Sequence, residues 1–319
     1  MPGPVFRTEI KLSPSPWKIQ HQDRLFCIGS CFAEHLHLRF KAGGFHSDCN
    51  PCGIVYNPIS IGLQIRRILD GPAWNEQDLI HDRGLVHGLH HHGSFSSPRQ
   101  EDCLSRMNDS LHEARDRFER MDVLILTLGT AIWYKHKASG QAVANCHKIP
   151  TSEFERGFMN VEEVVQSVES WLPELLKRRP GIKILLTVSP VRYLKEGFGD
   201  NSISKATLVL AADQLCRRNE SIFYFPAYEI LLDDLRDYRF YKEDMVHPNE
   251  QAVQYIWTCF QSTYFSKETR QIADEVSRLV EARSHRPLHP GSPEHKSFIE
   301  KMETRAKDLK FKYPCLNLE

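Results

Sequence analysis

The sequence predicts a three-layer α/β domain built on a parallel sheet, which we place at residues 20–265. Short apolar runs rich in β-forming residues recur along the chain, and stretches with helical spacing of apolar residues separate them. Strand and helix alternate in this way five times. Such alternation is typical of a parallel sheet with helices on both faces.

Two strands and two helices are expected in the first part of the domain. Residues 25–29 form an apolar run that ends at a glycine, and residues 32–40 follow with an apolar stripe at four-residue spacing. Residues 45–49 can form a second, extended segment. Residues 58–69 carry the apolar side of the next helix.

The clearest strand lies in the middle of the chain, at residues 123–128, and Gly129 closes it. It is apolar on both faces, which suits a central parallel strand. Residues 182–188 repeat the pattern. Between these two strands, Asn160 and Glu163 have the spacing of a capping pair at the start of a helix.

The end of the domain is expected to contain a helix, a strand and a final helix. Ser204 is positioned to cap a helix over residues 205–217, and Pro226 ends a strand over residues 222–225. The final helix is expected to start after Pro248, because proline is favoured in the first helical turn.

Two regions lie outside this alternation. Residues 71–118 are a long insertion between strands, of the kind that often serves as a lid or binding loop. Residues 266–319 are expected to form a helical extension packed on the domain, with residues 285–291 joining two helices. The insertion contains a histidine group that can bind metal, contact substrate as a lid or form an exposed polar loop: His87, His90, His91 and His92.

Charge and composition exclude several classes of protein. The chain has 319 residues, with 41 Lys and Arg against 41 Asp and Glu, so it lacks the basic surface of a nucleic-acid or membrane-surface protein. No apolar run approaches the roughly 18–20 residues of a membrane span. Residues 1–7 lack the features of a secretory signal, and nine scattered cysteines do not resemble a disulfide framework. We therefore expect a cytoplasmic protein.

Residues that are candidates for a catalytic or ligand-binding site follow the expected strands or precede the final helix, at residues 29–31, 129–131 and 243–248. Ligand sites of open parallel sheets lie at the carboxyl ends of the strands. In the last segment, Asp244 precedes His247 by three residues, so its carboxylate can orient the imidazole as in the base–orienter pair of acyl-transfer sites.

Ser30 and Cys31 stand where a nucleophile is needed, at the start of a helix. Free N–H groups and the positive end of the helix lower the pKa of a thiol and stabilise an oxyanion. The alternative is structural. Ser30 can be an N-cap with Cys31 packed inside, and Asp244 and His247 can be an ordinary loop carboxylate and a helix-capping histidine.

Seven motifs resemble those of a known family. They are residues 28–34 (IGSCFAE), 50–58 (NPCGIVYNP), 127–131 (TLGTA), 144–148 (ANCHK), 188–192 (VSPVR), 225–229 (FPAYE) and 244–248 (DMVHP). The sequence resembles the GSCFA family from about residue 24 into the C-terminal helices. That family is placed with the SGNH/GDSL hydrolases, so the resemblance implies a flavodoxin-like α/β/α fold and acyl-ester chemistry without a metal or cofactor.

The resemblance also assigns roles to residues. The first superfamily block is Gly-Asp-Ser, and its register puts Cys31 at the nucleophile and Ser30 at the aspartate; either residue can be the nucleophile, and the register favours Cys31. It makes His247 the general base and Asp244 its orienting partner. The third block is Gly-x-Asn, and here Ala131 replaces the asparagine that helps to hold the oxyanion.

Either other groups then supply the oxyanion donors, or the oxyanion hole is weaker. Asn145 or His147 can replace the missing side chain, and Gly53 can supply a backbone N–H as the glycine of the second block does. Thr130 lies beside Ala131 at the same strand end and completes the set of expected oxyanion or substrate-binding residues.

The leading hypothesis is an SGNH-like esterase acting on an O-acyl sugar or a similar small ester. An acyltransferase using the same site and a non-catalytic binding module are the alternatives. A zinc-stabilised domain is a further one, with the ligands Cys27, Cys31, Cys49 and Cys52. Two more groups could contact substrate or be ordinary surface and core. They are the cations Lys148, Arg192 and Lys205 and the aromatic residues Tyr228, Tyr238, Phe240 and Tyr241.

Overall fold

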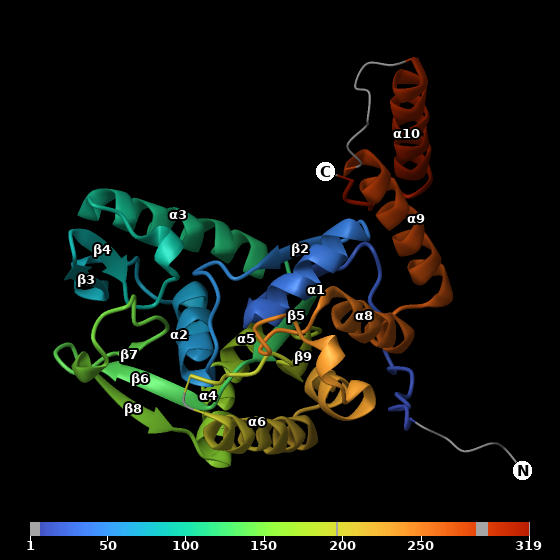
Figure 1. The fold of residues 1–319 in the computed structure, drawn as a ribbon. Helices are drawn as coiled ribbons and strands as arrows, with labels where there is room; N and C mark the ends of the chain where they lie inside the picture. The colour runs from blue at the N-terminus through green and yellow to red at the C-terminus, as the bar shows by residue number, and fades with distance from the viewer. Residues whose placement is uncertain (1–6, 196, 285–292, 319) are drawn as a thin grey trace, which may run out of the picture.

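A five-stranded parallel sheet forms the centre of the protein (Figure 1). The structure is a computed structural model that describes residues 7–195, 197–284 and 293–318. The strands are β1 (Arg24–Gly29), β2 (His46–Cys49), β5 (Val123–Leu128), β9 (Lys183–Val188) and β10 (Ile222–Tyr224). Their spatial order is β2-β1-β5-β9-β10. This is the flavodoxin-like order, so the predicted fold class is confirmed.

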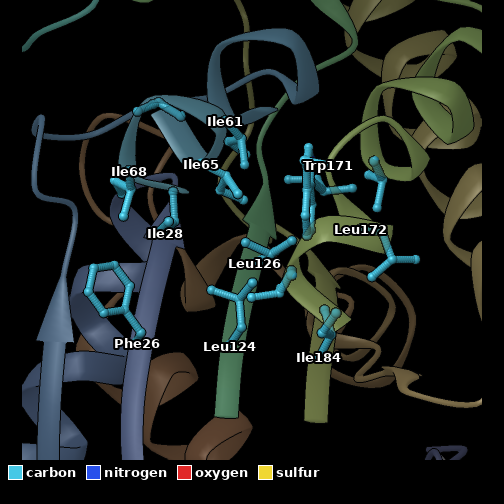
Figure 2. Packing of buried hydrophobic residues seen from close by; sticks show 14 of the residues in the cluster. Phe26, Ile28, Ile61, Ile65, Ile68, Leu124, Leu126, Trp171, Leu172 and Ile184 are labelled. Carbon is cyan, nitrogen blue, oxygen red and sulfur yellow. The ribbon is translucent and has the colours of Figure 1, made fainter. Parts of the chain in front are cut away.

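Helices cover both faces of the sheet because its strands are apolar on both sides. Along β1, Phe26 and Ile28 belong to one core layer, while Leu25 and Cys27 belong to the other. The first layer is covered by α2 (Pro58–Leu69), α3 (Gln100–Phe118), α4 (Val161–Glu169), α5 (Leu172–Arg178) and α6 (Phe198–Arg218). Figure 2 shows Ile65 of α2 over Leu126 of β5 in this layer.

The opposite layer contains the helices nearest to the candidate site. They are α1 (Cys31–Ala42), α7 (Ala227–Glu229), the π-helix η4 (Ile230–Leu235) and α8 (Glu250–Tyr264). Phe40 of α1 lies at the centre of this layer and packs edge-to-face on Trp257 and Phe260 of α8. The two helices are therefore fixed to each other as well as to the sheet.

Sequence signals for the helix starts were partly correct. Asn160 and Glu163 form the predicted capping box of α4. Ser204 does not cap a helix, because α6 already starts at Phe198 and the Ser204 hydroxyl accepts the Ala131 N–H at 2.7 Å. The N-cap of α8 is Asn249, so Pro248 lies just outside that helix.

Two small sheets interrupt the alternation, and the sequence did not predict them. The hairpin of β3 (Leu79–Asp82) and β4 (Leu85–Gly88) lies within the expected insertion. A second antiparallel sheet follows β5 directly and contains β6 (Ile132–His136), β7 (Ala142–Val143) and β8 (Phe154–Phe158). Short 3₁₀ helices lie at η1 (Glu76–Asp78), η2 (Gly93–Phe95), η3 (Thr151–Glu153) and η5 (Tyr238–Phe240). Both small sheets lie on the same side of the molecule in Figure 1.

The histidine group is mostly buried, so the alternative of an exposed polar loop was wrong for most of it. His91 is 1% exposed, while His87 and His90 are each 7% exposed; only His92 is exposed. The ring of His91 packs against Trp74 with the ring centroids 4.7 Å apart. Burial follows because the β3–β4 hairpin packs against α3 and the aromatic side chains around it.

Two helices, α9 (Lys267–Ser284) and α10 (Pro293–Lys312), follow α8 and extend away from the sheet in Figure 1. They are attached at the turn after α1, where the Ser277 hydroxyl donates to the Ala42 carbonyl at 3.2 Å and the Asn317 amide donates to the Gly44 carbonyl at 2.9 Å. The expected connection at residues 285–291 lies outside the described residues, as do residues 1–6. Of the helices in the described ranges, none has the length and apolar character to cross a bilayer.

Candidate active site

The turn after β1 is held tightly against β5. Gly29 has a φ of 141°, and a Cβ atom on it would lie 2.2 Å from the Thr127 carbonyl oxygen, so only glycine fits. The Gly29 N–H donates to Oδ1 of Asn50 at 2.8 Å. The Ser30 N–H donates to the Thr127 carbonyl at 3.1 Å. The residues after Gly29 therefore start from a fixed position on the C-terminal edge of the sheet.

Ser30 is the N-cap of α1. Its Oγ accepts the Phe32 N–H at 3.3 Å and lies 3.4 Å from Oγ1 of Thr127. The residue is 1% exposed, which leaves almost no surface for a substrate to approach the hydroxyl. The capping role that the sequence left open for Ser30 is thus present in the structure.

Cys31 is the first residue of α1 and is half-buried. Burial raises the pKa of its thiol, and the carboxylate of Glu34 raises it further. The backbone N–H of Cys31 itself and the charges of Lys205 and Lys242 lower the pKa, but burial is the largest cause. The resting site therefore holds a neutral thiol, which needs a base to become a nucleophile.

Asp244 and His247 form the pair that the sequence predicted, in the loop before α8. Oδ1 of Asp244 accepts the N–H groups of Val246 and His247, each at 2.9 Å. Its Oδ2 lies 2.7 Å from Nδ1 of His247. These bonds hold the pKa of Asp244 well below its usual range, with the backbone N–H groups as the largest cause. An ionised carboxylate can only accept, so Nδ1 carries the proton and Nε2 is left as the basic atom.

The loop with this pair faces the first turns of α1. His35 lies one turn after Cys31, and its pKa is lowered by burial first and then by the charges of Lys242 and His247. Lys242 also acts on Cys31. The Lys242 N–H donates to the His247 carbonyl at 2.8 Å, which closes the loop. No hydrogen bond in the described chain joins the Cys31 sulfur to the His247 ring, and Nε2 of His247 has no partner there.

Gly53 and Thr130 do not offer free donors. The Gly53 N–H donates to the Asn50 carbonyl at 2.7 Å. The Thr130 N–H donates to the Tyr56 carbonyl at 2.9 Å, and its hydroxyl bonds to Ser204 at 3.0 Å. Gly53 is needed for another reason: at its φ of 82°, a Cβ atom would lie 2.2 Å from the Cβ of His92.

Asn145 and His147 support the contact between the second sheet and the hairpin. Oδ1 of Asn145 accepts the His147 N–H at 2.8 Å, and Nε2 of His147 bonds to the Gly88 carbonyl at 2.9 Å. The ring of His147 also stacks on His87, with the centroids 4.5 Å apart. Burial lowers the pKa of His147 to about 4. No hydrogen bond, ion pair or ring contact in the described chain joins these two side chains to Cys31 or His247.

Three further residues lie near Cys31: Lys205, which was expected from the sequence as a possible substrate contact, and Tyr56 and Asn50, which the sequence did not place in the site. Lys205 is buried and affects the thiol electrostatically. Burial and the neighbouring Cys31 raise the pKa of Tyr56 to about 12. Asn50 holds the Gly29 turn, and its buried Nδ2 has no hydrogen-bond partner among the described residues. Lys205 and the motif that contains Asn50 and Tyr56 were noted in the sequence, but only the fold brings them to this edge.

A shallow cleft of about 610 Å³ adjoins the His247 loop. Arg192 connects the cleft to the His247 loop. Its backbone N–H donates to the Val246 carbonyl at 3.1 Å, and its guanidinium lies 4.0 Å from the centroid of the Tyr241 ring. Tyr238 also lines the cleft, whereas Phe240 is part of the core. The remaining lining residues are Glu229, Leu231, Leu232, Asp233, Arg236 and Asp237.

The structure gives no support to a zinc site at the cysteines. In residues 7–195, 197–284 and 293–318, no three His, Cys, Asp or Glu side chains come close enough together to hold a metal ion. Cys27 and Cys52 lie in different core layers. Burial raises the pKa of both thiols to about 12, so neither is a ready thiolate ligand.

Comparisons with protein families match almost the whole chain. The GSCFA family matches residues 24–260, and the GSCFA domain protein, C-terminal domain, matches residues 276–319. No curated protein matches the chain.

Among solved structures, the chain is similar to three esterases. An acetyl esterase mutant crystallised with acetate has a TM-score of 0.27 and 12% identity, over 53% of this chain and 67% of that one. A carbohydrate esterase of family 3 from Talaromyces cellulolyticus has a TM-score of 0.26 and 11% identity, over 52% of this chain and 65% of that one. An acetyl xylan esterase from the rumen bacterium Butyrivibrio proteoclasticus has a TM-score of 0.31 and 12% identity, over 81% of this chain and 64% of that one. The chain thus spans about two thirds of their lengths, and similarities this low carry no conclusion about its activity.

Proposed function

The chain belongs to the GSCFA family, and on that premise we propose that it hydrolyses an acyl ester with Cys31 as the nucleophile. His247 is the general base and Asp244 orients it. The observation that carries the proposal is the Asp244–His247 pair, whose 2.7 Å bond leaves Nε2 of the imidazole without a partner in the described chain, on a loop that faces the first turns of α1.

The reaction follows the chemistry of a neutral thiol that a base must deprotonate. Nε2 of His247 takes the proton of Cys31 as the sulfur attacks the acyl carbonyl. The tetrahedral intermediate collapses, the bond to the leaving oxygen breaks, and the imidazolium returns the proton to the departing alkoxide. Water then attacks the thioester with His247 again as base. Acid and free Cys31 thiol are released, and no metal or cofactor takes part.

The choice of Cys31 over Ser30 is supported by burial and bonding. The Ser30 hydroxyl is engaged at the start of α1 and is almost fully covered, while Cys31 is half-buried. In this proposal the Cys31 N–H, which already acts on the sulfur, is the backbone donor to the oxyanion.

The cleft beside the His247 loop is proposed to hold the alcohol part of the ester. Its wall presents the ring of Tyr241 with the Arg192 guanidinium stacked on it, next to Tyr238. Flat aromatic and guanidinium surfaces with carboxylates nearby suit an O-acyl sugar or another small polyhydroxylated ester. An alcohol bound in place of water would turn the same site into an acyltransferase.

A non-catalytic binding module is the second candidate. The bonding of the expected oxyanion donors favours it. The N–H groups of Gly53 and Thr130 are bonded within the protein, and so are the side chains of Asn145 and His147. In a binding module, ester or sugar binding would persist in variants that lack Cys31 or His247, and the wild type would hydrolyse nothing.

The test measures hydrolysis of p-nitrophenyl acetate by the wild type and by H247A, with H112A as the control because His112 is an exposed histidine on α3. H247A should lose hydrolysis to within the background rate, and H112A should keep the wild-type rate. Full activity in H247A would remove the proposed mechanism, and a wild type without activity on any short acyl ester would favour the binding module.

A further inference from the structure

Lys205 is fully buried at the C-terminal edge of the central sheet. It lies in α6 and is 1% exposed. Its Nζ donates to the Gly129 carbonyl at 2.7 Å and to the Ser189 carbonyl at 2.8 Å. These two carbonyls directly follow β5 and β9, so the ammonium group is fixed between the ends of two central strands.

The charge of Lys205 has no carboxylate partner in the described chain. The nearest aromatic ring is that of Tyr228, with its centroid 5.6 Å from Nζ. Two backbone carbonyls and a ring compensate a buried ammonium only in part. Burial accordingly lowers the pKa of Lys205 to about 7. A negative charge formed nearby would stabilise the protonated lysine, and the lysine would stabilise that charge in return.

Cys31 is the nearby group that can become negative. The Ser30 N–H is bonded to the carbonyl of Thr127, and Lys205 to that of Gly129, two residues further along the same strand end. Their charges interact, since Lys205 lowers the pKa of Cys31 and Cys31 raises that of Lys205. The backbone geometry and the electrostatics agree on this proximity.

We propose that Lys205 is a positioning residue of the proposed esterase site, whose ammonium charge stabilises the anion that develops at Cys31 during acyl transfer. The inference rests on the proposed function for its role in catalysis. It also offers a replacement for the missing asparagine: the Ala131 side chain has no donor and its N–H is bonded to Ser204, while Lys205 places a cation at the end of β5.

Other charged groups around Cys31 act differently. Glu34 lies on the same helix and opposes ionisation of the thiol. Lys242 lies on the exposed loop that leads to His247, where salt and water screen its charge. Tyr56 also interacts with Cys31 but keeps its proton, because burial raises the pKa of its phenol to about 12. Among these groups, Lys205 alone combines a positive charge with burial.

The test follows alkylation of Cys31 by iodoacetamide against pH and quantifies the peptide that contains Cys31 by mass spectrometry. K205M removes the charge and the two hydrogen bonds, while K205Q removes the charge but keeps an amide donor. K205R keeps the charge, and K242M is the control for an exposed lysine near the same thiol. Circular dichroism establishes that each variant is folded.

The neutral variants should lower the alkylation rate about tenfold at pH 6, where Lys205 carries its charge, and the difference should vanish above pH 9, where Lys205 is neutral. K205R should restore much of the rate at pH 6, and the difference should persist in 1 M NaCl, whereas K242M should change little. A wild-type alkylation rate at pH 6 in folded K205Q or K205M would overturn the inference. Alkylation needs no ester. If the variants show the rate difference and the wild type hydrolyses no ester, the proposed function fails and the charge relationship stands.

Discussion

Nδ1 of His247 lies 2.7 Å from Oδ2 of Asp244, and the other oxygen of that carboxylate binds two backbone N–H groups. One side chain thus shapes the loop and orients the imidazole. D244N separates these tasks, because an amide oxygen can still accept the N–H groups while the amide nitrogen cannot accept from Nδ1. We expect D244N to lower kcat for p-nitrophenyl acetate by a factor on the order of 10⁴, with an unchanged melting temperature.

The matched variant is D244A, which removes both functions of the carboxylate. It should lose the same activity and also loosen the loop, visible as faster proteolysis near Val246. Because hydrogen bonding keeps the pKa of Asp244 low, the acid limb of the rate profile should not report the titration of this carboxylate. D244N with wild-type kcat would show that orientation of the imidazole is not needed.

The S30A variant should lose stability and keep activity. The Ser30 hydroxyl caps α1 by accepting the Phe32 N–H, and loss of such a cap costs about 1 kcal/mol. Urea unfolding measures this cost, and hydrolysis of p-nitrophenyl acetate measures activity. C31A should show the opposite pattern, with little loss of stability and no hydrolysis. Loss of hydrolysis in a folded S30A protein would make Ser30 the nucleophile.

Gly53 should act through the backbone and not through the oxyanion. Its N–H is bonded to the Asn50 carbonyl, and alanine there would place a Cβ 2.2 Å from the Cβ of His92 at a positive φ. We expect G53A to lower the free energy of unfolding by about 2 kcal/mol or more. A variant with normal unfolding and a greatly reduced kcat would instead restore the oxyanion role.

His91 should make the protein less stable in acid. Burial is the main cause that lowers its pKa to about 3, from 6.5 in the unfolded chain. Between pH 6.5 and 3 the unfolded state therefore binds more protons, and stability falls as the pH falls through that window. Between pH 7 and pH 5 the loss from this one group is about 2 kcal/mol.

H91L should make the free energy of unfolding less dependent on pH between 7 and 5, because leucine does not titrate. H112A is the control, since His112 is exposed. Urea denaturation at both pH values measures the difference. An equal pH dependence of the free energy of unfolding in H91L and the wild type would mean that the pKa of His91 is not lowered in the folded protein.

The sheet could be predicted because its strands carry their own signal. Residues 123–128 are apolar on both faces, as a central parallel strand requires, and the capping box at Asn160 is local in sequence. The contact between Asp244 and His247 could also be predicted from local sequence, since the two residues lie three positions apart in one loop.

Features that depend on distant contacts could not be predicted. Strand β6 carries mixed polar and aromatic residues and pairs with β8, some twenty residues later, around a glycine covered by Trp133. Ser204 resembles a cap, but its partner is the Ala131 N–H. In the sequence Lys205 resembles a surface lysine, but in the fold it donates to carbonyl groups at the ends of two strands. No local pattern encodes these partners.

Trapping the acyl-enzyme tests the central claim most directly. The wild type is mixed with p-nitrophenyl acetate, quenched in acid within the first turnover, and digested for mass spectrometry. The account predicts one acetyl group on the peptide that contains Cys31, a label that accumulates in wild type and is absent from H247A and C31A. Acetyl on Ser30 or on another residue, or equal labelling of Cys31 in H247A, would contradict it.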